Sequence, residues 1–154
     1  MAVPAKRARP YPQCNWLVDL GDGDTGSIDA GFQECSNIGA EATIAEYRVG
    51  NAKENAVMKV SLLNKATDVT LKRGVVGSSK LWDWFDQVRN GDLSALRIVR
   101  IHLMSEDHNE TVVTWTLKNC RPVKATFASL NAKGTDVAME ELTMAYERLE
   151  QDHS

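Results

Sequence analysis

The acidic segment DGDTG, residues 22–26, carries the side chains with the clearest potential for chemistry. A calcium loop that starts at Asp22 would place Ser27 where the turn glycine belongs and Gln33 where the bidentate glutamate belongs. The triplet DTG at 24–26 is also the short signature of aspartic proteases, in which two carboxylates share one proton. The sequence has no second such turn, so two chains would have to supply one each. We therefore interpret the segment as a tight turn that depends on its glycines.

The histidines and cysteines form no recognisable metal or disulfide pattern. His102 and His108 have no further ligands at useful spacing, which favours roles facing solvent. Cys14, Cys35 and Cys120 are odd in number and lack a CxxC motif, so we expect reduced, mostly buried thiols. The sequence also has no GxxxxGK[ST] phosphate-binding loop and no nucleophile beside a base. We expect neither a cofactor nor an enzyme.

The composition is that of one globular domain. The 154 residues are 43% hydrophobic and 25% charged, which is enough for a sizeable core. The sequence contains no apolar run long enough to cross a membrane, and the N-terminus lacks the apolar segment of a signal peptide. The net charge of −3 is too small to indicate a nucleic-acid or membrane partner. We expect a basic, proline-containing arm at residues 1–12 and a single domain at residues 13–150.

Alternating apolar and polar residues predict most of the chain to be strand. The predicted strands span residues 14–20, 69–72, 97–104, 111–119 and 123–130, and Pro122 is expected to break the run between the last two. Residues 137–151 have helical propensity, yet Leu142, Met144 and Tyr146 alternate. Local pattern alone leaves helix and strand open for this run.

One amphipathic helix is expected after the strand at 69–72. Leu81, Trp84, Phe85 and Val88 fall on one face of about three turns. Ser78 or Ser79 can cap this helix, Asp83 lies in its first turn, and Gly91 follows its last turn. Its apolar face must pack on a sheet.

The pattern of residues 43–58 predicts a long hairpin with a polar tip. Ile44, Glu46 and Arg48 alternate with Ala45, Tyr47 and Val49 before a polar stretch, and apolar character resumes at Val57 and Met58. Such a hairpin has little core of its own. On residue pattern alone, this segment can be interpreted as a mobile surface hairpin.

Six segments in order resemble the tail tube proteins of contractile phages and of phage-derived extracellular contractile injection systems. They cover roughly residues 12–149 and are FQECS (32–36), EYRVGN (46–51), VTLKRG (69–74), LWDW (81–84), VTW (113–115) with PVK (122–124), and DVAME (136–140) through AYE (145–147). The basic arm and the acidic, glycine-rich residues 21–31 depart from this pattern.

This resemblance implies a mainly β fold, a small barrel of two packed antiparallel sheets with one flanking α-helix. It implies that the run from residue 137 is a strand through about Leu149, because strand pairing often overrides helical propensity. It implies a structural inner tube subunit that forms hexameric rings stacked head to tail around a cargo-conducting pore. The implied partners are other copies of the chain, a sheath outside, and baseplate or spike and terminator proteins at the ends. It also implies assembly in the bacterial cytoplasm and then a place in a phage tail or a tail-like injection particle.

The expected subunit interface comes from the same resemblance. The hairpin would contact the neighbouring ring, and Lys72 and Arg73 would add charged contacts. The predicted interface residues are Glu46, Tyr47, Arg48, Asn51, Lys53, Glu54, Asn55, Lys72 and Arg73. The rival interpretation is a monomeric β-barrel that binds a small ligand among its tryptophans and methionines.

Overall fold

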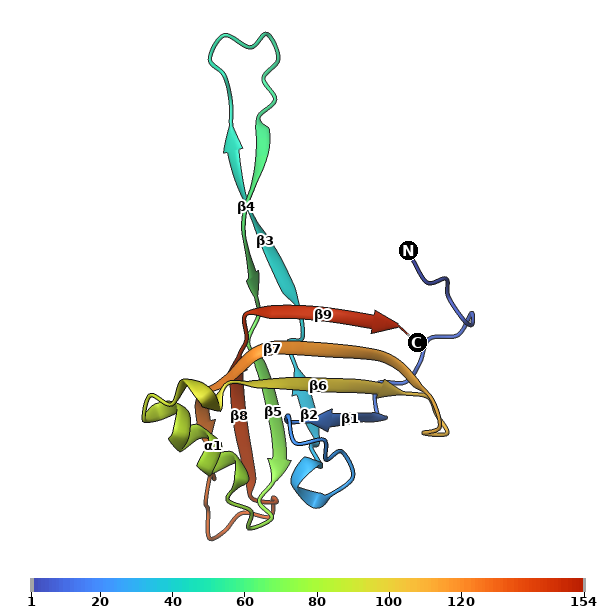
Figure 1. The fold of residues 1–154 in the computed structure, drawn as a ribbon, viewed down its shortest axis with the longest axis vertical. Coiled ribbons are helices and arrows are strands. Elements are labelled where there is room, and N and C mark those ends of the chain that lie inside the picture. The colour runs from blue at the N-terminus through green and yellow to red at the C-terminus, as the bar shows by residue number, and fades with distance from the viewer. Residues whose placement is uncertain (1, 154) are drawn as a thin grey trace.

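The structure is a computed structural model that describes residues 2–153, and it consists mainly of antiparallel strands with one α-helix (Figure 1). Two short 3-10 turns, η1 and η2, interrupt the loops. The elements in chain order are β1 (Trp16–Asp19), η1 (Ile28–Ala30), β2 (Glu34–Ser36), β3 (Ala40–Tyr47), β4 (Met58–Ala66), β5 (Val69–Gly74), α1 (Lys80–Arg89), η2 (Leu93–Ala95), β6 (Arg97–Met104), β7 (Thr111–Thr126), β8 (Met139–Ala145) and β9 (Arg148–His153).

Strand β7 joins two sheets whose strands run in different directions (Figure 1). Its first part pairs with β6 and β9, and β6 pairs in turn with β1. Its second part pairs with β8, which continues the ladder through β5 to β2. The predicted pair of antiparallel sheets with one helix is confirmed. Within the described residues the ladder stays open rather than closing into a barrel, because it ends on one side at β1 and on the other at β2.

The core lies between the sheets and follows from strand alternation. On β5, Val69 and Leu71 point inward, and on β8, Leu142 and Met144 meet them. Side chains that alternate across a strand place one full row on the buried face. The largest fully buried side chain is Trp84 of α1. The helix therefore completes a core that the two sheets alone leave uncovered.

Helix α1 forms as its sequence predicts. Leu81 and Trp84 are buried, and the Trp84 Nε1 donates a hydrogen bond of 2.8 Å to the carbonyl oxygen of Ala95. The helix ends before Gly91, whose φ of 83° is a conformation that glycine adopts without strain. No helix in the described part of the chain is long and apolar enough to cross a membrane.

The predicted break at Pro122 is wrong. Strand β7 runs without interruption from Thr111 to Thr126, and residues 127–130 lie outside it. Pro122 lies where the register between β7 and β8 shifts. A proline lacks an N–H to donate, and a bulge is one of the places where a sheet tolerates that loss.

The C-terminal run is strand, as predicted, but it is divided between the two sheets. Strand β8 pairs with β5 and the second part of β7, whereas β9 pairs with the first part of β7. Tyr146 lies in the connection, is buried, and donates a hydrogen bond of 2.9 Å to the carbonyl oxygen of Gly39. The connection at Tyr146 therefore links β8 in one sheet to β9 in the other. Its hydrogen bond also holds the residue that precedes β3.

Candidate functional site: the protruding hairpin

Strands β3 and β4 form a two-stranded hairpin that extends away from the two sheets along the longest axis of the molecule (Figure 1). The pairing runs from Ala40 opposite Ala66 to Tyr47 opposite Met58, with a register shift between Ala42 and Ile44. The predicted hairpin is therefore present, and residues 48–57 form its tip. We call residues 40–66 the hairpin.

The two faces of the hairpin differ in chemistry. Cross-strand partners share a face, and residues two apart on one strand do too. Ala45 is opposite Val60 and Tyr47 is opposite Met58, and Leu62 follows Val60 on the same face. The other face carries polar and charged side chains together with one isoleucine: Glu46 opposite Lys59, and Ile44 opposite Ser61. We call Ala45, Tyr47, Met58, Val60 and Leu62 the apolar face of the hairpin.

This apolar face is open to solvent. The side chains of Tyr47, Met58, Val60 and Leu62 are 57%, 55%, 47% and 51% exposed. A two-stranded hairpin is marginally stable on its own, because neither face rests on a core. A contiguous row of exposed apolar side chains marks a surface for another protein. The hairpin therefore has the chemistry of an assembly element.

The predicted polar residues of the hairpin are all exposed. Glu46 and Tyr47 end β3, and the remaining predicted residues belong to the tip. Arg48 donates hydrogen bonds of 3.4 Å to the carbonyl oxygen of Ala52 and to the Oδ1 of Asn55, which helps to shape the tip. Asn51, Lys53 and Glu54 lie at the far end, available for contact with a neighbour.

Lys72 and Arg73, the other predicted contacts, point to opposite sides of β5. Lys72 is partly exposed and lies 3.7 Å from a carboxylate oxygen of Glu34 and 3.4 Å from one of Glu141. Arg73 is 1% exposed and forms an ion pair with Glu140 inside the subunit. The expectation that Arg73 offers its charge at the surface is wrong, because the inward positions of β5 alternate and Arg73 occupies one of them.

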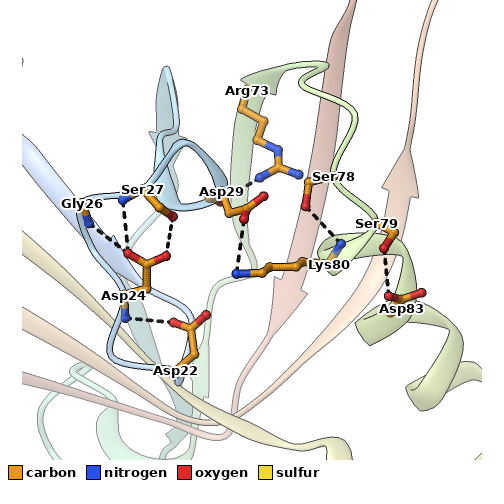
Figure 2. Close-up of polar contacts among 10 residues, drawn as sticks. All are labelled: Asp22, Asp24, Gly26, Ser27, Asp29, Arg73, Ser78, Ser79, Lys80 and Asp83. Atoms are coloured by element: carbon orange, nitrogen blue, oxygen red, sulfur yellow. Dashed lines mark hydrogen bonds and ion pairs between the residues drawn. The ribbon is translucent and has the colours of Figure 1, made fainter.

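Arg73 also contacts the loop before β2 (Figure 2). Its Nη1 donates a hydrogen bond of 2.7 Å to the carbonyl oxygen of Asp29, and the Asp29 carboxylate lies 3.2 Å from the Nζ of Lys80. Hydrogen bonds from Ser78 and then Lys80 lower the pKa of Asp29 below its usual value. Through these contacts at Asp29, the loop before β2 is held against β5 and the N-terminal end of α1.

The acidic carboxylates of this loop shape its turns (Figure 2). The Asp24 carboxylate accepts hydrogen bonds from the backbone N–H groups of Gly26 and Ser27 and from the Ser27 hydroxyl. The Ser27 contacts are the main cause of the lowered pKa of Asp24. The Asp22 carboxylate accepts from the Asp24 N–H at 3.0 Å. Gly21 and Gly23 have φ angles of 97° and 79°, so the turn depends on glycine, as predicted.

The remaining candidate ligands are dispersed. Residues 2–153 contain no group of three or more His, Cys, Asp or Glu side chains that could hold a metal ion. Of the three free cysteines, Cys120 is buried and Cys35 is half-buried, whereas Cys14 is exposed. The Nδ1 of His102 lies 2.9 Å from the Thr114 hydroxyl oxygen. Burial lowers the pKa of the His102 imidazole.

Of the apolar face, the predicted interface residues include only Tyr47 and omit Ala45, Met58, Val60 and Leu62. The prediction ended the hairpin at Met58, where the second strand only begins. The signal was present, because apolar residues at 58, 60 and 62 alternate with Lys59 and Ser61. That pattern predicts a strand with one apolar face, and within residues 2–153 about half of the surface of these side chains stays exposed.

Comparisons with known proteins agree with this geometry. Residues 12–150 match the family described as T4-like virus tail tube protein gp19. Among solved structures, the chain is similar to a chain of the sheath-tube complex of an extracellular contractile injection system, PVC, in its extended state. That match has 25% identity and a TM-score of 0.82 over 94% of this chain and 93% of that chain.

Two further matches concern the fold alone. A chain of the anti-feeding prophage tube-terminating cap is 22% identical, with a TM-score of 0.84 over 99% of this chain and 97% of that chain. A chain of the native gene transfer agent virion is 10% identical, with a TM-score of 0.62 over 93% of this chain and 99% of that chain. Comparison with curated proteins gives no match.

Proposed function

The chain belongs to the T4-like virus tail tube protein family and is a structural inner tube subunit of a phage tail or tail-like injection particle, not an enzyme; from this premise we propose that its copies form hexameric rings stacked head to tail around a pore. The observation that carries the proposal is the exposed apolar face of the hairpin. A contiguous exposed apolar surface of this kind marks a site where another protein binds.

Stacking through the hairpin uses two different surfaces. The hairpin extends from one end of the subunit (Figure 1), and in this proposal it meets a part of its neighbour other than the neighbour's own hairpin. A contact between two unlike surfaces that is repeated along one axis, without a rotation that closes it into a ring, continues until a terminator stops it. This kind of contact suits a tube.

Lateral joining within a ring uses the open edges of the sheets. Strands β1 and β2 end the ladder, and β9 pairs on one side only. An unpaired strand edge presents free N–H and C=O groups to any other chain. Pairing of these edges around a ring satisfies those groups and gives a continuous wall around the pore. The conduit carries cargo.

The parts of the chain have different roles in this proposal. Residues 13–150 form the tube domain and residues 1–12 an arm outside it, which the start of the family match at residue 12 supports. Glu46, Arg48 and the tip residues contact the adjoining ring, and Lys72 contributes a charged contact.

The similar structures support a proposal for the environment of the subunit. One of these contains sheath and tube together, another is described as a sheath and tube terminator, and a third as a baseplate. By analogy, the chain assembles in the bacterial cytoplasm with a sheath around it and with baseplate or spike and terminator proteins at its ends.

The particle mass of the purified chain tests this proposal. A ring has six times the subunit mass of 17.0 kDa, and a stacked tube has more. A monomeric ligand-binding barrel, the rival interpretation, keeps the subunit mass at every concentration. Light scattering across a wide concentration range distinguishes the two, and a single-copy species throughout would contradict the tube.

A further inference from the structure

A second apolar surface lies on the body of the subunit, at the end of the first sheet. The ends of β6 and β7 that are joined by residues 105–110 extend past β2 and β5 (Figure 1), so the second sheet leaves part of their inner face uncovered. The end of the N-terminal arm borders this part and leaves a groove of about 260 Å³. We call it the arm groove, and the side chains that matter here are Tyr11, Gln13, Trp16, Ile38, Leu103 and Trp115.

The arm groove has the composition of an interface centre. None of its lining residues carries a charge, and three of them are aromatic. The centres of protein interfaces are depleted in charge and enriched in aromatic side chains, which contribute most of the binding energy. Trp16 and Trp115 pack against the core from one side and are only partly buried, so each keeps a surface to offer.

We propose that the arm groove of one copy receives the apolar face of the hairpin of a second copy. This inference rests on the proposed function and names the receiving surface for the hairpin. The occupant is another copy because the chain carries both halves of the contact, and its own hairpin extends away from the ends of β6 and β7 that line the groove (Figure 1).

The areas support a contact of this kind. Tyr47, Met58, Val60 and Leu62 are each about half exposed. Side chains of these sizes present on the order of 400 Å² together, about half of the roughly 800 Å² that each partner contributes to a standard interface. The polar tip and the groove rim supply the remainder. Each copy gives one hairpin and offers one groove, so the contact is repeated at every subunit. One such contact alone is weak, and the sum over many subunits stabilises the assembly.

The charges are compatible with this orientation. Glu46 and Lys59 lie on the opposite face of the hairpin, so they remain in solvent when the apolar face is buried. Burying an unpaired charge would cost far more than the apolar contact contributes. The hairpin can therefore dock by one face only.

Cysteine crosslinking between chains tests the contact. All subunits carry Cys14→Ser, which removes the exposed thiol. Half of them carry Val60→Cys on the apolar face, and the other half carry Gln13→Cys at the rim of the groove, where the side chain is exposed. Cys35 also lines the groove, but burial raises its thiol pKa to about 12, so it reacts little. The mixed subunits are assembled and treated with a short bismaleimide.

The inference predicts a covalent dimer whose linked peptides contain positions 60 and 13. The matched control, Lys59→Cys on the opposite face, should lose this product. Leu62→Cys, on the same face as Val60, should again give a crosslinked dimer with position 13. This second variant shows that the crosslink does not depend on a distortion caused by Val60→Cys. Assemblies that form without the 60–13 link would overturn the inference and leave the proposed function intact. Subunits that stay monomeric, the unmutated chain included, would overturn both.

Discussion

Arg73 on β5 lies directly opposite Glu140 on β8, and the two side chains form an ion pair inside the subunit. The pair is almost fully enclosed, with 1% of the Arg73 side chain and 8% of the Glu140 side chain exposed. Arg73 also bonds the Asp29 carbonyl, whereas its Nη2 is the one buried side-chain nitrogen or oxygen without a partner in residues 2–153. This pair links the central strands of the second sheet to the loop before β2.

Replacing Arg73 should therefore destabilise the subunit. Arg73→Met leaves the Glu140 carboxylate buried and unpaired, and breaking a buried pair in this way costs about 3 to 5 kcal/mol. The double variant Arg73→Met with Glu140→Leu should recover most of that loss, because no charge remains. Denaturant unfolding measures both. Equal stabilities for Arg73→Met and the unmutated chain would show that the pair has no structural role.

Trp84 should anchor α1, whereas Trp82 should not. Trp84 is 1% exposed and bonds the Ala95 carbonyl, so Trp84→Ala should cost about 3 to 5 kcal/mol. Trp82→Ala removes a 43% exposed side chain and should cost about 1 kcal/mol or less. The unfolding free energies of the two variants provide the comparison. Similar losses for both would contradict the burial of Trp84 and the exposure of Trp82.

The apolar face of the hairpin should be needed for assembly and dispensable for folding. Val60→Asp places a charge on a side chain that is 47% exposed, so the unfolding free energy should change by about 0.5 kcal/mol or less. The particle mass should fall to that of a free subunit or ring. Lys59→Asp, next to it on the opposite face, serves as the control and should still stack. Tubes of normal length from Val60→Asp would remove this face from the interface.

Acid should release the loop before β2 from α1. The pKa of Asp29 is lowered by hydrogen bonds from Ser78 and Lys80, so its folded pKa lies below its value in the unfolded chain. The stabilisation is complete above the usual value of 3.8 and is lost as the pH falls through the lower folded pKa. An NMR titration of the Asp29 carboxyl and of the Lys80 amide should show one shared transition in that range. Asp29→Asn should abolish this transition, and a transition at or above 3.8 would contradict the contact.

Local pattern predicted the regular elements well. Strand β6 occupies residues 97–104, where alternation placed it, and α1 begins and ends at its predicted serine and glycine signals. These features depend on neighbours in sequence, which is why the chain alone reveals them. The family resemblance extended this success to the strand character of the C-terminal run, against its helical propensity.

Two of the errors concern features that depend on distant partners. The break predicted at Pro122 rests on the missing N–H of proline, and the register shift with β8 accommodates that loss. The charged contact predicted at Arg73 rests on its place beside the turn glycine, and the sequence does not show that Glu140 lies opposite it. The hairpin is a different case. It is predicted to end at Met58, although the alternation of residues 58–62 is a local signal.

Electron microscopy of the purified, unmutated chain is the most direct test that copies of this subunit build a conduit. The account predicts hollow tubes of stacked rings with a sixfold axis, in which the hairpin of each subunit crosses to the neighbouring ring. Compact single particles without sixfold symmetry at every protein concentration would contradict it.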